Sequence, residues 1–361
     1  MKVYKVSRMK FWFDVLTPKQ VNFFKPLVDE LRNRKHDVLC TARNYREVVE
    51  LAKIKNFEML VVGEHGGESL YGKLYASAQI VEKLIDIVDK FKPDSLISLA
   101  SPEASRVAFG LGMRHVGFCD APHAEAVCRL SIPLMSLLMC PSIIPAREFT
   151  RYGIDAKKLI RYKALDPAMW LRNGVKQIYK HSDLGLDPSK KTITFRFEES
   201  QAAYLRGIDK SLSFKMLRVL VNSFDYSNIV VLSRYADQIE ALKKEFASKA
   251  IVIERVIDGT SLLMLSDIFI GSGGTMNWEC ALLGIPNISY TSMKYYVNEY
   301  LIKKGLIARC RDAAALPKFV NKMLFDDNYG KSLKRKSKSE LSKMEDLKKL
   351  TIKVLESLQF K

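Results

Sequence analysis

Short apolar runs alternate with longer amphipathic stretches along most of this chain. Apolar runs bounded by turn residues are typical of buried strands, and apolar residues spaced three or four apart are typical of helices. In the first half the predicted strands are residues 9–15, 37–41, 59–62, 95–99 and 115–119, with helices at 19–34, 44–55 and 69–91 and another that ends at Gly112. In the second half the predicted strands are residues 192–197, 229–233, 251–254, 268–270 and 287–290, with helices near 201–222, 236–248, 258–265, 275–283 and 295–304. This alternation predicts an α/β fold with parallel, doubly wound sheets.

The alternation stops around Asp166-Pro167 and resumes after Gly174, which predicts a boundary between two domains. A chain of 361 residues is long enough to build two full cores. We therefore expect two Rossmann-like domains, residues 1–168 and 169–330, that face each other across a cleft. Residues 331–361 keep apolar positions at helical spacing and are expected to form one basic amphipathic helix.

The chain is strongly basic, with a formal net charge of +18. The excess is densest in residues 331–361, where ten Lys and Arg stand against four Asp and Glu. A terminal helix packed on the protein with a solvated basic face explains this run best, and peripheral contact with an anionic membrane is the alternative. No recognisable nucleic-acid module accompanies the charge, so a nucleic-acid partner is not expected.

The cysteines and the apolar segments indicate a cytoplasmic protein. The six cysteines are scattered, with no Cys-x-x-Cys pair and no Cys/His cluster at zinc spacing, which is typical of reduced thiols. The first 30 residues contain no apolar signal segment. Residues 130–146 are uncharged but contain three prolines and are shorter than the roughly 20 residues that span a membrane. We expect a buried helix and strand there.

Residues 266–290 carry the clearest local pattern for ligand binding. A short strand is followed by the turn Gly271-Ser-Gly-Gly274, a helix to Leu283, and Gly284-Ile-Pro286 at the helix end. The N-terminus of such a helix presents unpaired N–H groups that suit a phosphate or diphosphate. The predicted nucleotide-binding residues are Ser272, Gly273, Gly274 and Thr275, with Glu279 one turn further on to accept both hydroxyls of a ribose.

The same pattern has a purely architectural interpretation. In that case the glycines only allow a tight turn between strand and helix, and Glu279 only complements the helix dipole. A Rossmann NAD site is not indicated, because the glycine spacing is not Gly-x-Gly-x-x-Gly. In addition, the next strand ends in Ser289-Tyr290 rather than in an acidic residue.

Other polar residues also follow predicted strands, at the carboxyl ends where open α/β sheets bind ligands. In the first half these residues are Asp14, Glu103, Asp120, His123 and Glu125. The loop Gly63-Glu-His-Gly-Gly67 is at the same edge and is either a ligand lid, which its position favours, or a flexible connection. In the second half, Arg234 ends the predicted strand 229–233 and Arg196 lies inside the predicted strand 192–197. Both would clamp phosphates, although Arg196 has the alternative of pointing into the interdomain surface. No Asp-x-Asp motif is present, so we expect no divalent metal and no cofactor.

These motifs resemble those of the GT-B superfamily of glycosyltransferases and related epimerases. The segment Ser272-Gly-Gly-Thr with Glu279 and Gly284-Ile-Pro286 is similar to the donor-nucleotide motif of the N-acetylglucosaminyltransferase of peptidoglycan synthesis. A resemblance over nearly the whole chain is to a largely archaeal family with a domain of unknown function, grouped with UDP-N-acetylglucosamine 2-epimerases. Its motifs here are Phe11-Trp-Phe-Asp14, Thr17-Pro-Lys, Phe23-Phe-Lys-Pro26, Thr41-Ala-Arg43, Asp258-Gly-Thr-Ser-Leu-Leu263 and Gly271 to Gly284.

The acids of the epimerases are matched only in part. Epimerases place one acid in a His-Val-Glu-Ala-Gly segment, but here His115-Val116 is followed by Gly117-Phe118. Residues 124–129 resemble their Pro-Glu-Glu-x-Asn-Arg segment and retain Glu125 and Arg129, whereas Glu103 matches a third acid imperfectly. Because epimerisation needs carboxylates placed as acid and base, a transferase fits the residues better.

The resemblance therefore implies a metal-independent glycosyltransferase that uses a nucleotide-sugar, UDP-linked donor. Its acceptor would be a sugar or a lipid-linked sugar of surface glycan or glycolipid synthesis. Asp120 or His123 is expected to deprotonate the acceptor, with Asp14 as a weaker candidate. For each of these residues the alternative is an ordinary loop cap or salt-bridge partner. The alternatives are an enzyme similar to UDP-N-acetylglucosamine 2-epimerase, and a non-catalytic protein that binds nucleotide-sugars or nucleic acid. The oligomeric state is left open.

Overall fold

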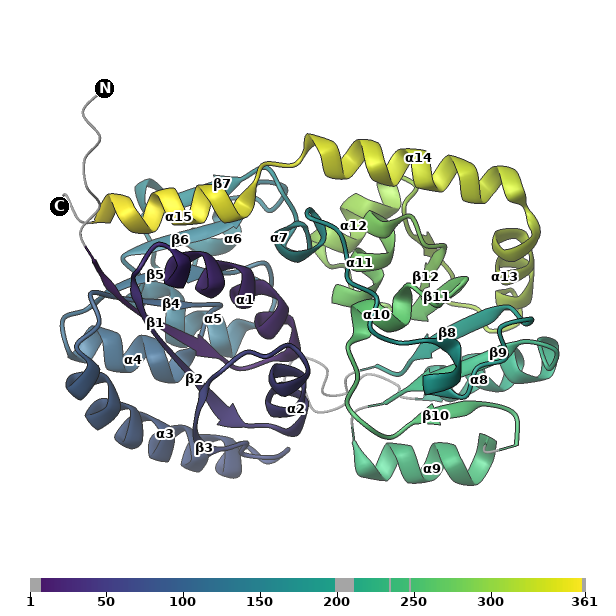
Figure 1. Ribbon diagram of the computed structural model, residues 1–361, viewed down its shortest axis with the longest axis horizontal. Helices are drawn as coiled ribbons and strands as arrows, with labels where there is room; N and C mark the ends of the chain where they lie inside the picture. The colour runs from purple at the N-terminus through teal and green to yellow at the C-terminus, as the bar shows by residue number, and fades with distance from the viewer. Residues whose placement is uncertain (1–7, 199–210, 234, 247, 359–361) are drawn as a thin grey trace. The chain divides into compact units, whose positions relative to one another are not determined.

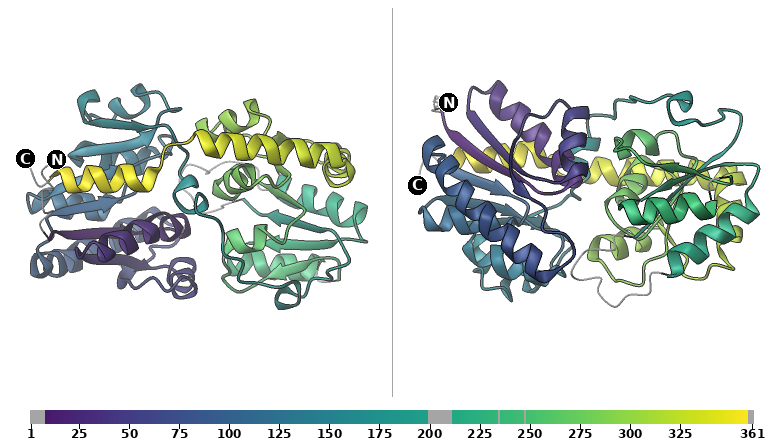
Figure 2. Two further views of the ribbon diagram at one scale, coloured as in Figure 1. Left: turned by 45° about the horizontal axis from the view of Figure 1, so that its top comes forward. Right: turned by 90° about the horizontal axis from the view of Figure 1, so that it is seen from below.

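The computed structural model describes residues 8–198, 211–233, 235–246 and 248–358 (Figure 1). The chain divides into two compact units. Unit 1 comprises Met1–Trp170 together with Glu345–Lys361, and unit 2 comprises Leu171–Met344. Each unit is built around one parallel sheet with helices on both faces, as Figure 2 also shows.

Unit 1 contains a seven-stranded sheet in the order β3-β2-β1-β4-β5-β6-β7. Its strands are β1 (Lys10–Val15), β2 (Asp37–Asn44), β3 (Leu60–Glu64), β4 (Ser95–Ser98), β5 (Arg114–Phe118), β6 (Leu137–Pro141) and β7 (Leu159–Tyr162). From β1 the chain first builds outward through β2 and β3 and then returns to add β4 on the other side. The order therefore reverses between β1 and β4, which is where sheets of this kind bind ligands.

Unit 2 contains a six-stranded sheet in the order β10-β9-β8-β11-β12-β13. Its strands are β8 (Thr192–Arg196), β9 (Asn228–Leu232), β10 (Ile251–Ile253), β11 (Ile268–Gly271), β12 (Asn287–Ser289) and β13 (Ala308–Arg309). Here the order reverses between β8 and β11. All recorded strand pairs in both sheets are parallel, as the βα alternation predicts.

Most helices follow the strands in the order that the apolar spacing predicts, but the helices at residues 147–150, 168–171 and 316–325 were not predicted. Those of unit 1 are α1 (Pro18–Asn33), α2 (Arg46–Ile54), α3 (Leu70–Phe91), α4 (Pro102–Gly110), α5 (Glu125–Ser131), α6 (Arg147–Thr150) and α15 (Leu347–Ser357), and α7 (Ala168–Leu171) lies at the division. Those of unit 2 are α8 (Ser211–Ser223), α9 (Ala236–Phe246), α10 (Gly259–Leu263), α11 (Thr275–Leu283), α12 (Tyr296–Lys303), α13 (Leu316–Phe325) and α14 (Asp327–Lys343).

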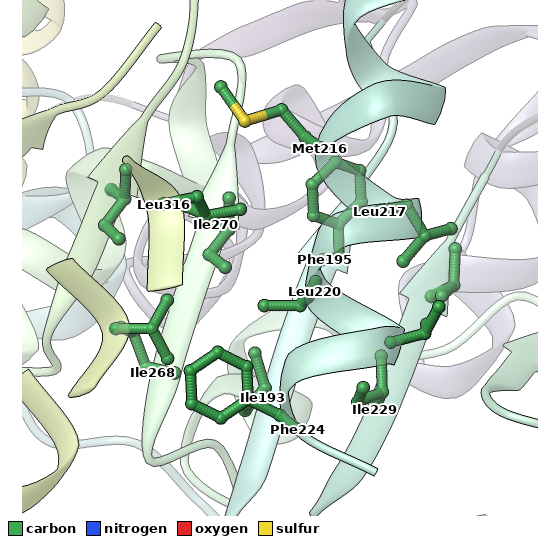
Figure 3. Close-up of a cluster of buried hydrophobic side chains, with 14 of the residues drawn as sticks. Ile193, Phe195, Met216, Leu217, Leu220, Phe224, Ile229, Ile268, Ile270 and Leu316 are labelled. Atoms are coloured by element: carbon green, nitrogen blue, oxygen red, sulfur yellow. The ribbon is translucent and has the colours of Figure 1, made fainter. Parts of the chain in front are cut away.

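The core of each unit follows from the alternation of side chains along its central strands. In unit 2, Ile193 and Phe195 of β8 and Ile268 of β11 point to one face and pack with buried residues of α8 and α13 (Figure 3). In unit 1, Trp12 of β1 packs with Ile80 of α3, whereas the neighbouring Phe13 points the other way and contacts Phe24 of α1, ring centroids 5.3 Å apart. Helices α3 and α1 therefore cover opposite faces of this sheet.

The C-terminal segment departs from the expectation of one helix over residues 331–361. The structure has two helices, α14 and α15, separated by residues 344–346, of which Met344 is extended. Asp346 ends the break because its carboxylate accepts a hydrogen bond from the backbone N–H of Lys349 (3.0 Å) and thereby caps α15. Within the described residues, no helix combines the length and the apolar character needed to cross a membrane.

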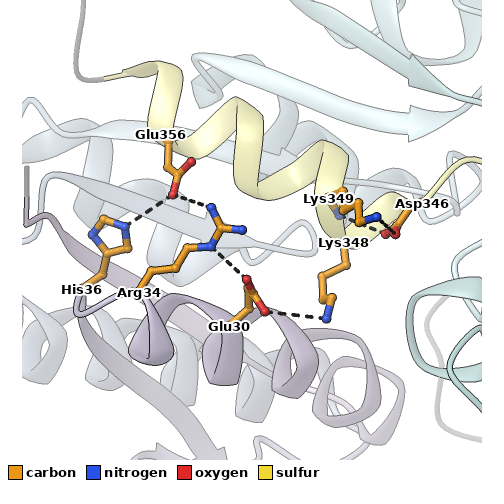
Figure 4. Close-up of polar contacts among 7 residues, drawn as sticks. All are labelled: Glu30, Arg34, His36, Asp346, Lys348, Lys349 and Glu356. Carbon is orange, nitrogen blue, oxygen red and sulfur yellow. Dashed lines mark hydrogen bonds and ion pairs between the residues drawn. The ribbon is translucent and has the colours of Figure 1, made fainter. Parts of the chain in front are cut away.

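Helix α15 packs on unit 1 through an apolar face and a short polar network (Figure 4). Leu347, Ile352 and Leu355 are buried. Glu356 lies 3.0 Å from the guanidinium of Arg34 and 3.7 Å from the imidazole of His36. Residues 1–170 and the end of the chain thus share one folded body.

Three other differences concern short or partly described elements. The strands β7 and β13, only four and two residues long, were not predicted. The uncharged stretch 130–146 contains the expected strand, β6. The expected buried helix is reduced to the last residues of α5, where Leu130 is exposed, and a short 3₁₀ turn (Ile132–Leu134). The helix expected at 201–222 is described only from Ser211 onward, and residues 201–210 lie outside the described part of the chain.

Candidate functional site

The glycine turn of unit 2 joins β11 to α11 and is fixed by side chains around it. Gly273 has φ +82°, a conformation that favours glycine, and its N–H donates to Oδ1 of Asn277 (2.8 Å). A Cβ on Gly273 would lie 2.8 Å from Oγ of Ser289 and 3.0 Å from Nδ2 of Asn298. Asn277 in turn donates to the carbonyl of Ile288 in β12 (3.0 Å). The turn is therefore held against β12 and keeps one shape.

The other predicted residues of the turn are open to different degrees. Gly274 is exposed, whereas Ser272 and Thr275 are half-buried. Thr275 begins α11, so the backbone N–H groups of this first turn have no partner within the helix. The turn and the helix start can accommodate an anionic group here, although the N–H of Gly273 is already used by Asn277.

Glu279 lies one turn into α11 and is only 3% exposed. One of its carboxylate oxygens accepts a hydrogen bond of 2.5 Å from the hydroxyl of Thr260. Thr260 is itself buried on the short helix α10, which packs against α11. Sequence reasoning missed Thr260, although it lies in the segment Asp258-Gly-Thr that marks the family resemblance. A carboxylate held in this way has a fixed orientation.

Arg196 lies beside the glycine turn. In the pairing of β8 with β11, Phe195 is opposite Ile270, so Arg196 comes next to Gly271 at the carboxyl edge. Arg196 is half-buried, and its backbone carbonyl accepts a hydrogen bond from the hydroxyl of Tyr290 (2.9 Å). Arg234, the second predicted phosphate ligand, lies outside the described residues. The predicted nucleotide half-site therefore comprises the glycine turn, Glu279 and Arg196.

In unit 1, Asp14 lies at the carboxyl end of β1, at the reversal of the strand order. It is 3% exposed and accepts hydrogen bonds of 2.6 Å each from the hydroxyls of Thr41 and Ser101. Burial raises the pKa of Asp14 to about 6, although these two hydrogen bonds oppose the rise. Glu103 is half-buried in the first turn of α4. Its negative charge raises the pKa of Asp14 further, by less than burial does.

A half-buried lysine, Lys19, binds Asp120, which was predicted as a candidate base. The ammonium of Lys19 lies 2.5 Å from Asp120 and 2.7 Å from Asp166. The hydroxyl of Tyr162 donates to the second oxygen of Asp166 (2.6 Å). Burial opposes the charge on Lys19, but the two aspartates outweigh it and raise the pKa of Lys19. Asp120 is thus an ion-pair partner of Lys19 through one of its two carboxylate oxygens.

His123 and Glu125 occupy the same loop but differ in environment. Burial, with a smaller contribution from the charge of Lys19, lowers the pKa of His123 to about 4. The imidazole is therefore neutral at physiological pH and can accept a proton. Glu125 is exposed at the start of α5 and forms an ion pair with Arg129 (2.7 Å) one turn further on. His123 is therefore the neutral candidate of this region, whereas Asp120 and Glu125 are each held in an ion pair.

Lys19 and Asp166 were not predicted as site residues. Lys19 was named only at a helix start and in the Thr17-Pro-Lys motif of the family resemblance, and Asp166 only at a domain boundary. Their pairing was missed because it joins positions far apart in the sequence. Across the described parts of the chain, no three His, Cys, Asp or Glu side chains gather closely enough to hold a metal ion.

Two Rossmann-like domains with parallel sheets place this chain in the GT-B fold class of glycosyltransferases and epimerases. The chain belongs to the family described as "Protein of unknown function (DUF354)", whose model matches residues 9–358. An uncharacterized protein of the archaeon Methanocaldococcus jannaschii is 30% identical over 328 residues, which cover 89% of this chain and 92% of the relative.

Solved structures share the fold at low sequence identity. UDP-GlcNAc 2-epimerase from Neisseria meningitidis, bound to UDP-GlcNAc, has a TM-score of 0.72 at 15% identity, covering 96% of this chain and 99% of its own. UDP-GlcNAc 2-epimerase from M. jannaschii has a TM-score of 0.65 at 16% identity, covering 91% and 98%. The spinosyn forosaminyltransferase SpnP has a TM-score of 0.65 at 14% identity, covering 97% and 100%. These likenesses establish the fold.

Proposed function

We propose that this protein is a nucleotide-sugar-dependent glycosyltransferase with a UDP-linked donor. The observation that carries the proposal is the strand–turn–helix unit of β11 and α11. Its glycine turn is fixed by Asn277, and the buried carboxylate of Glu279 follows one turn into the helix. In this proposal the helix N-terminus and Arg196 bind the diphosphate, and Glu279 accepts the hydroxyls of the ribose.

Unit 1 supplies the acceptor half of the reaction. Neutral His123 removes the proton from an acceptor hydroxyl, whose oxygen then forms a bond to the anomeric carbon of the donor sugar. The bond between that carbon and the diphosphate breaks, and UDP leaves with the electron pair. Arg196 and the N–H groups of α11 offset the negative charge that develops on the diphosphate, so the mechanism does not require a divalent metal. Asp120 serves as the ion-pair partner of Lys19 and takes no part in the proton transfer.

A second candidate function is epimerisation of UDP-N-acetylhexosamine. The observation in its favour is the extent of the fold likeness to UDP-GlcNAc 2-epimerases, up to 96% of this chain. The environments of the carboxylates argue against epimerisation, which needs one acid and one base. Asp120 is bound to Lys19, and Glu125 is exposed and paired with Arg129, so neither is placed as an acid–base pair.

Calorimetric titration with UDP, other nucleoside diphosphates and UDP-N-acetylglucosamine tests the proposal. We expect saturable binding of UDP and a loss of about 10-fold to 100-fold in affinity in Glu279→Ala, because hydrogen bonds to a charged group are removed. Glu240→Ala, at an exposed position of α9, is the matched control and should bind UDP like the unaltered protein. Failure of every nucleotide to bind would refute the proposal and leave the glycine turn as architecture only.

A further inference from the structure

Arg43 is a cation at the ligand edge of unit 1 that the proposed mechanism does not use. It lies near the end of β2, two residues after Thr41, and therefore on the same face of the sheet as the side chain of Thr41. That face carries Asp14 as well, because Thr41 donates to Asp14. Arg43 thus lies at the carboxyl edge, one strand from the reversal of the strand order.

The backbone around Arg43 is irregular in a way that sets its position. Ala42 pairs with Val61 of β3 and Asn44 pairs with Glu64, so Arg43 alone lies opposite two residues, Val62 and Gly63. Gly63 has φ +70°, and a Cβ there would lie 2.4 Å from Cγ1 of Ile80. Irregularities of this kind redirect a side chain at the end of a strand, and they are common beside functional sites.

The guanidinium of Arg43 is not neutralised by a direct contact with Asp14. Nε of Arg43 is buried and has no hydrogen-bond partner among the described residues. Asp14 is close enough for the charge of Arg43 to lower its pKa, but both oxygens of Asp14 accept hydrogen bonds from Thr41 and Ser101 instead. A buried N–H donor without a partner is costly, so this group is prepared for an acceptor that the protein itself does not supply.

Two aromatic rings support Arg43 from the neighbouring loops. The guanidinium lies over the ring of Tyr45, 5.8 Å from its centroid. Tyr45 in turn stacks on His65, with centroids 4.9 Å apart and ring planes at 24°. Cation–π contact and stacking fix the plane of the guanidinium, which is what bidentate binding of an oxyanion requires.

His65 belongs to the glycine loop that was predicted as a ligand lid or a flexible connection. A Cβ on Gly66 would lie 2.5 Å from the carbonyl oxygen of Gly72, so the loop packs tightly on the first turn of α3. Immediately beyond it, α3 exposes the apolar side chains of Leu70, Tyr71, Leu74 and Tyr75. The loop therefore connects the guanidinium to an exposed apolar helix face.

We infer that Arg43, supported by Tyr45 and His65, is the binding site in unit 1 for a phosphate group carried by the acceptor. A phosphate monoester offers three oxygens, enough to engage both terminal nitrogens of the guanidinium together. The assignment of this phosphate to the acceptor rests on the function proposed above. The anion site itself is inferred from the contacts of Arg43 and does not depend on that function. The phosphate is carried either by a sugar or by an isoprenoid lipid, whose apolar chain would meet the exposed start of α3.

The test is calorimetric titration of the full-length protein with glucose 1-phosphate and with geranyl phosphate, in the presence of saturating UDP. We expect at least one of them to bind and its affinity to fall by about 10-fold to 100-fold in Arg43→Gln. Arg46→Gln is the matched control, because Arg46 lies three residues further on and its guanidinium pairs with Glu50 at the surface. Tighter binding of geranyl phosphate would support a lipid-borne phosphate, and tighter binding of glucose 1-phosphate a sugar-borne one.

The titration of the same variants with UDP alone separates this inference from the proposed function. Arg43→Gln should bind UDP unchanged, which also shows that the variant is folded. If UDP does not bind to the unaltered protein, the proposed function fails, and the phosphate titrations are then made without UDP. Equal phosphate affinity in Arg43→Gln and the unaltered protein, or binding of neither phosphate, would overturn the inference.

Discussion

At the scale of single residues, burial and pairing separate the polar side chains of unit 1 into two groups. Asp14 accepts hydrogen bonds from two hydroxyl groups, and Asp120 forms an ion pair with the ammonium of Lys19. His123 is kept neutral by burial and by the charge of Lys19. Residues of the same chemical type therefore differ in what they can do, and this difference depends on contacts between distant segments.

The pH dependence of transfer should identify the base. A base acts in its deprotonated form, which for His123 persists down to a pKa of about 4. We therefore expect kcat/KM to stay level from pH 8 to about pH 5 and to fall below that, whereas an ordinary histidine would lose activity near its reference pKa of about 6.5. His123→Gln should lower kcat about 100-fold or more and leave UDP affinity unchanged.

The same profile distinguishes the buried aspartate. Burial raises the pKa of Asp14 to about 6. A fall in kcat/KM near pH 6 that persists in His123→Gln would therefore identify Asp14 as the base and contradict the role of His123. Asp14→Asn would then remove the pH 6 transition, which supplies the control.

At the scale of elements, the shape of the turn between β11 and α11 depends on Gly273 more than on the neighbouring Gly274. Gly273→Ala would force φ of +82° on a residue with a Cβ and bring that Cβ within 2.8 Å of Ser289 and Thr291. We expect a loss of roughly 2 kcal/mol or more in the free energy of unfolding of unit 2. Gly274→Ala meets no atom within 4 Å and should change it by no more than about 0.5 kcal/mol.

Denaturant unfolding of the two alanine variants, followed by a probe in unit 2, measures this difference. The two glycines are adjacent in the sequence, so each variant controls for the other. Equal losses in both would mean that the conformation of Gly273 does not hold the turn in shape.

The elements that could be predicted are those with a strong local pattern. Parallel strands, the helices between them and the glycine turn all follow from apolar spacing and turn residues within a few positions. Strands β7 and β13 are too short to show such a pattern. The break between α14 and α15 was hidden because apolar spacing continues through Met344 and Leu347, although Asp346 is a good capping residue.

The candidate site was predictable only in its local part. The glycine turn and Glu279 lie in one segment of sequence. In contrast, the contacts of Thr260 with Glu279 and of Lys19 with Asp166 join residues 19 and 147 positions apart, counted as 279 − 260 and 166 − 19. The orphaned Nε of Arg43 depends on how Thr41 and Ser101 bind Asp14. Nothing in a local pattern shows such contacts.

At the scale of the whole molecule, unit 1 is built from both ends of the chain and unit 2 from one continuous segment between them. Leu355 of α15 is fully buried in unit 1. Leu355→Ala should therefore cost about 2 to 5 kcal/mol in the free energy of unfolding of unit 1, because it removes apolar contact and leaves a cavity.

Urea unfolding followed by a probe in unit 1 checks this expectation. Lys353→Ala, at an exposed position two residues earlier on the same helix, is the control and should stay within about 0.5 kcal/mol of the unaltered protein. No loss in Leu355→Ala would show that α15 is not an integral part of unit 1.

The return of the chain to unit 1 through α15 also affects how the protein is made. Domains generally fold in the order in which they leave the ribosome, the N-terminal one first. Here unit 2 is complete once Met344 has been synthesised, while unit 1, begun first, still lacks Glu345–Lys361. The half of the protein that is translated first is therefore finished last, and the part of α1 that receives α15 stays uncovered while all of unit 2 is being made.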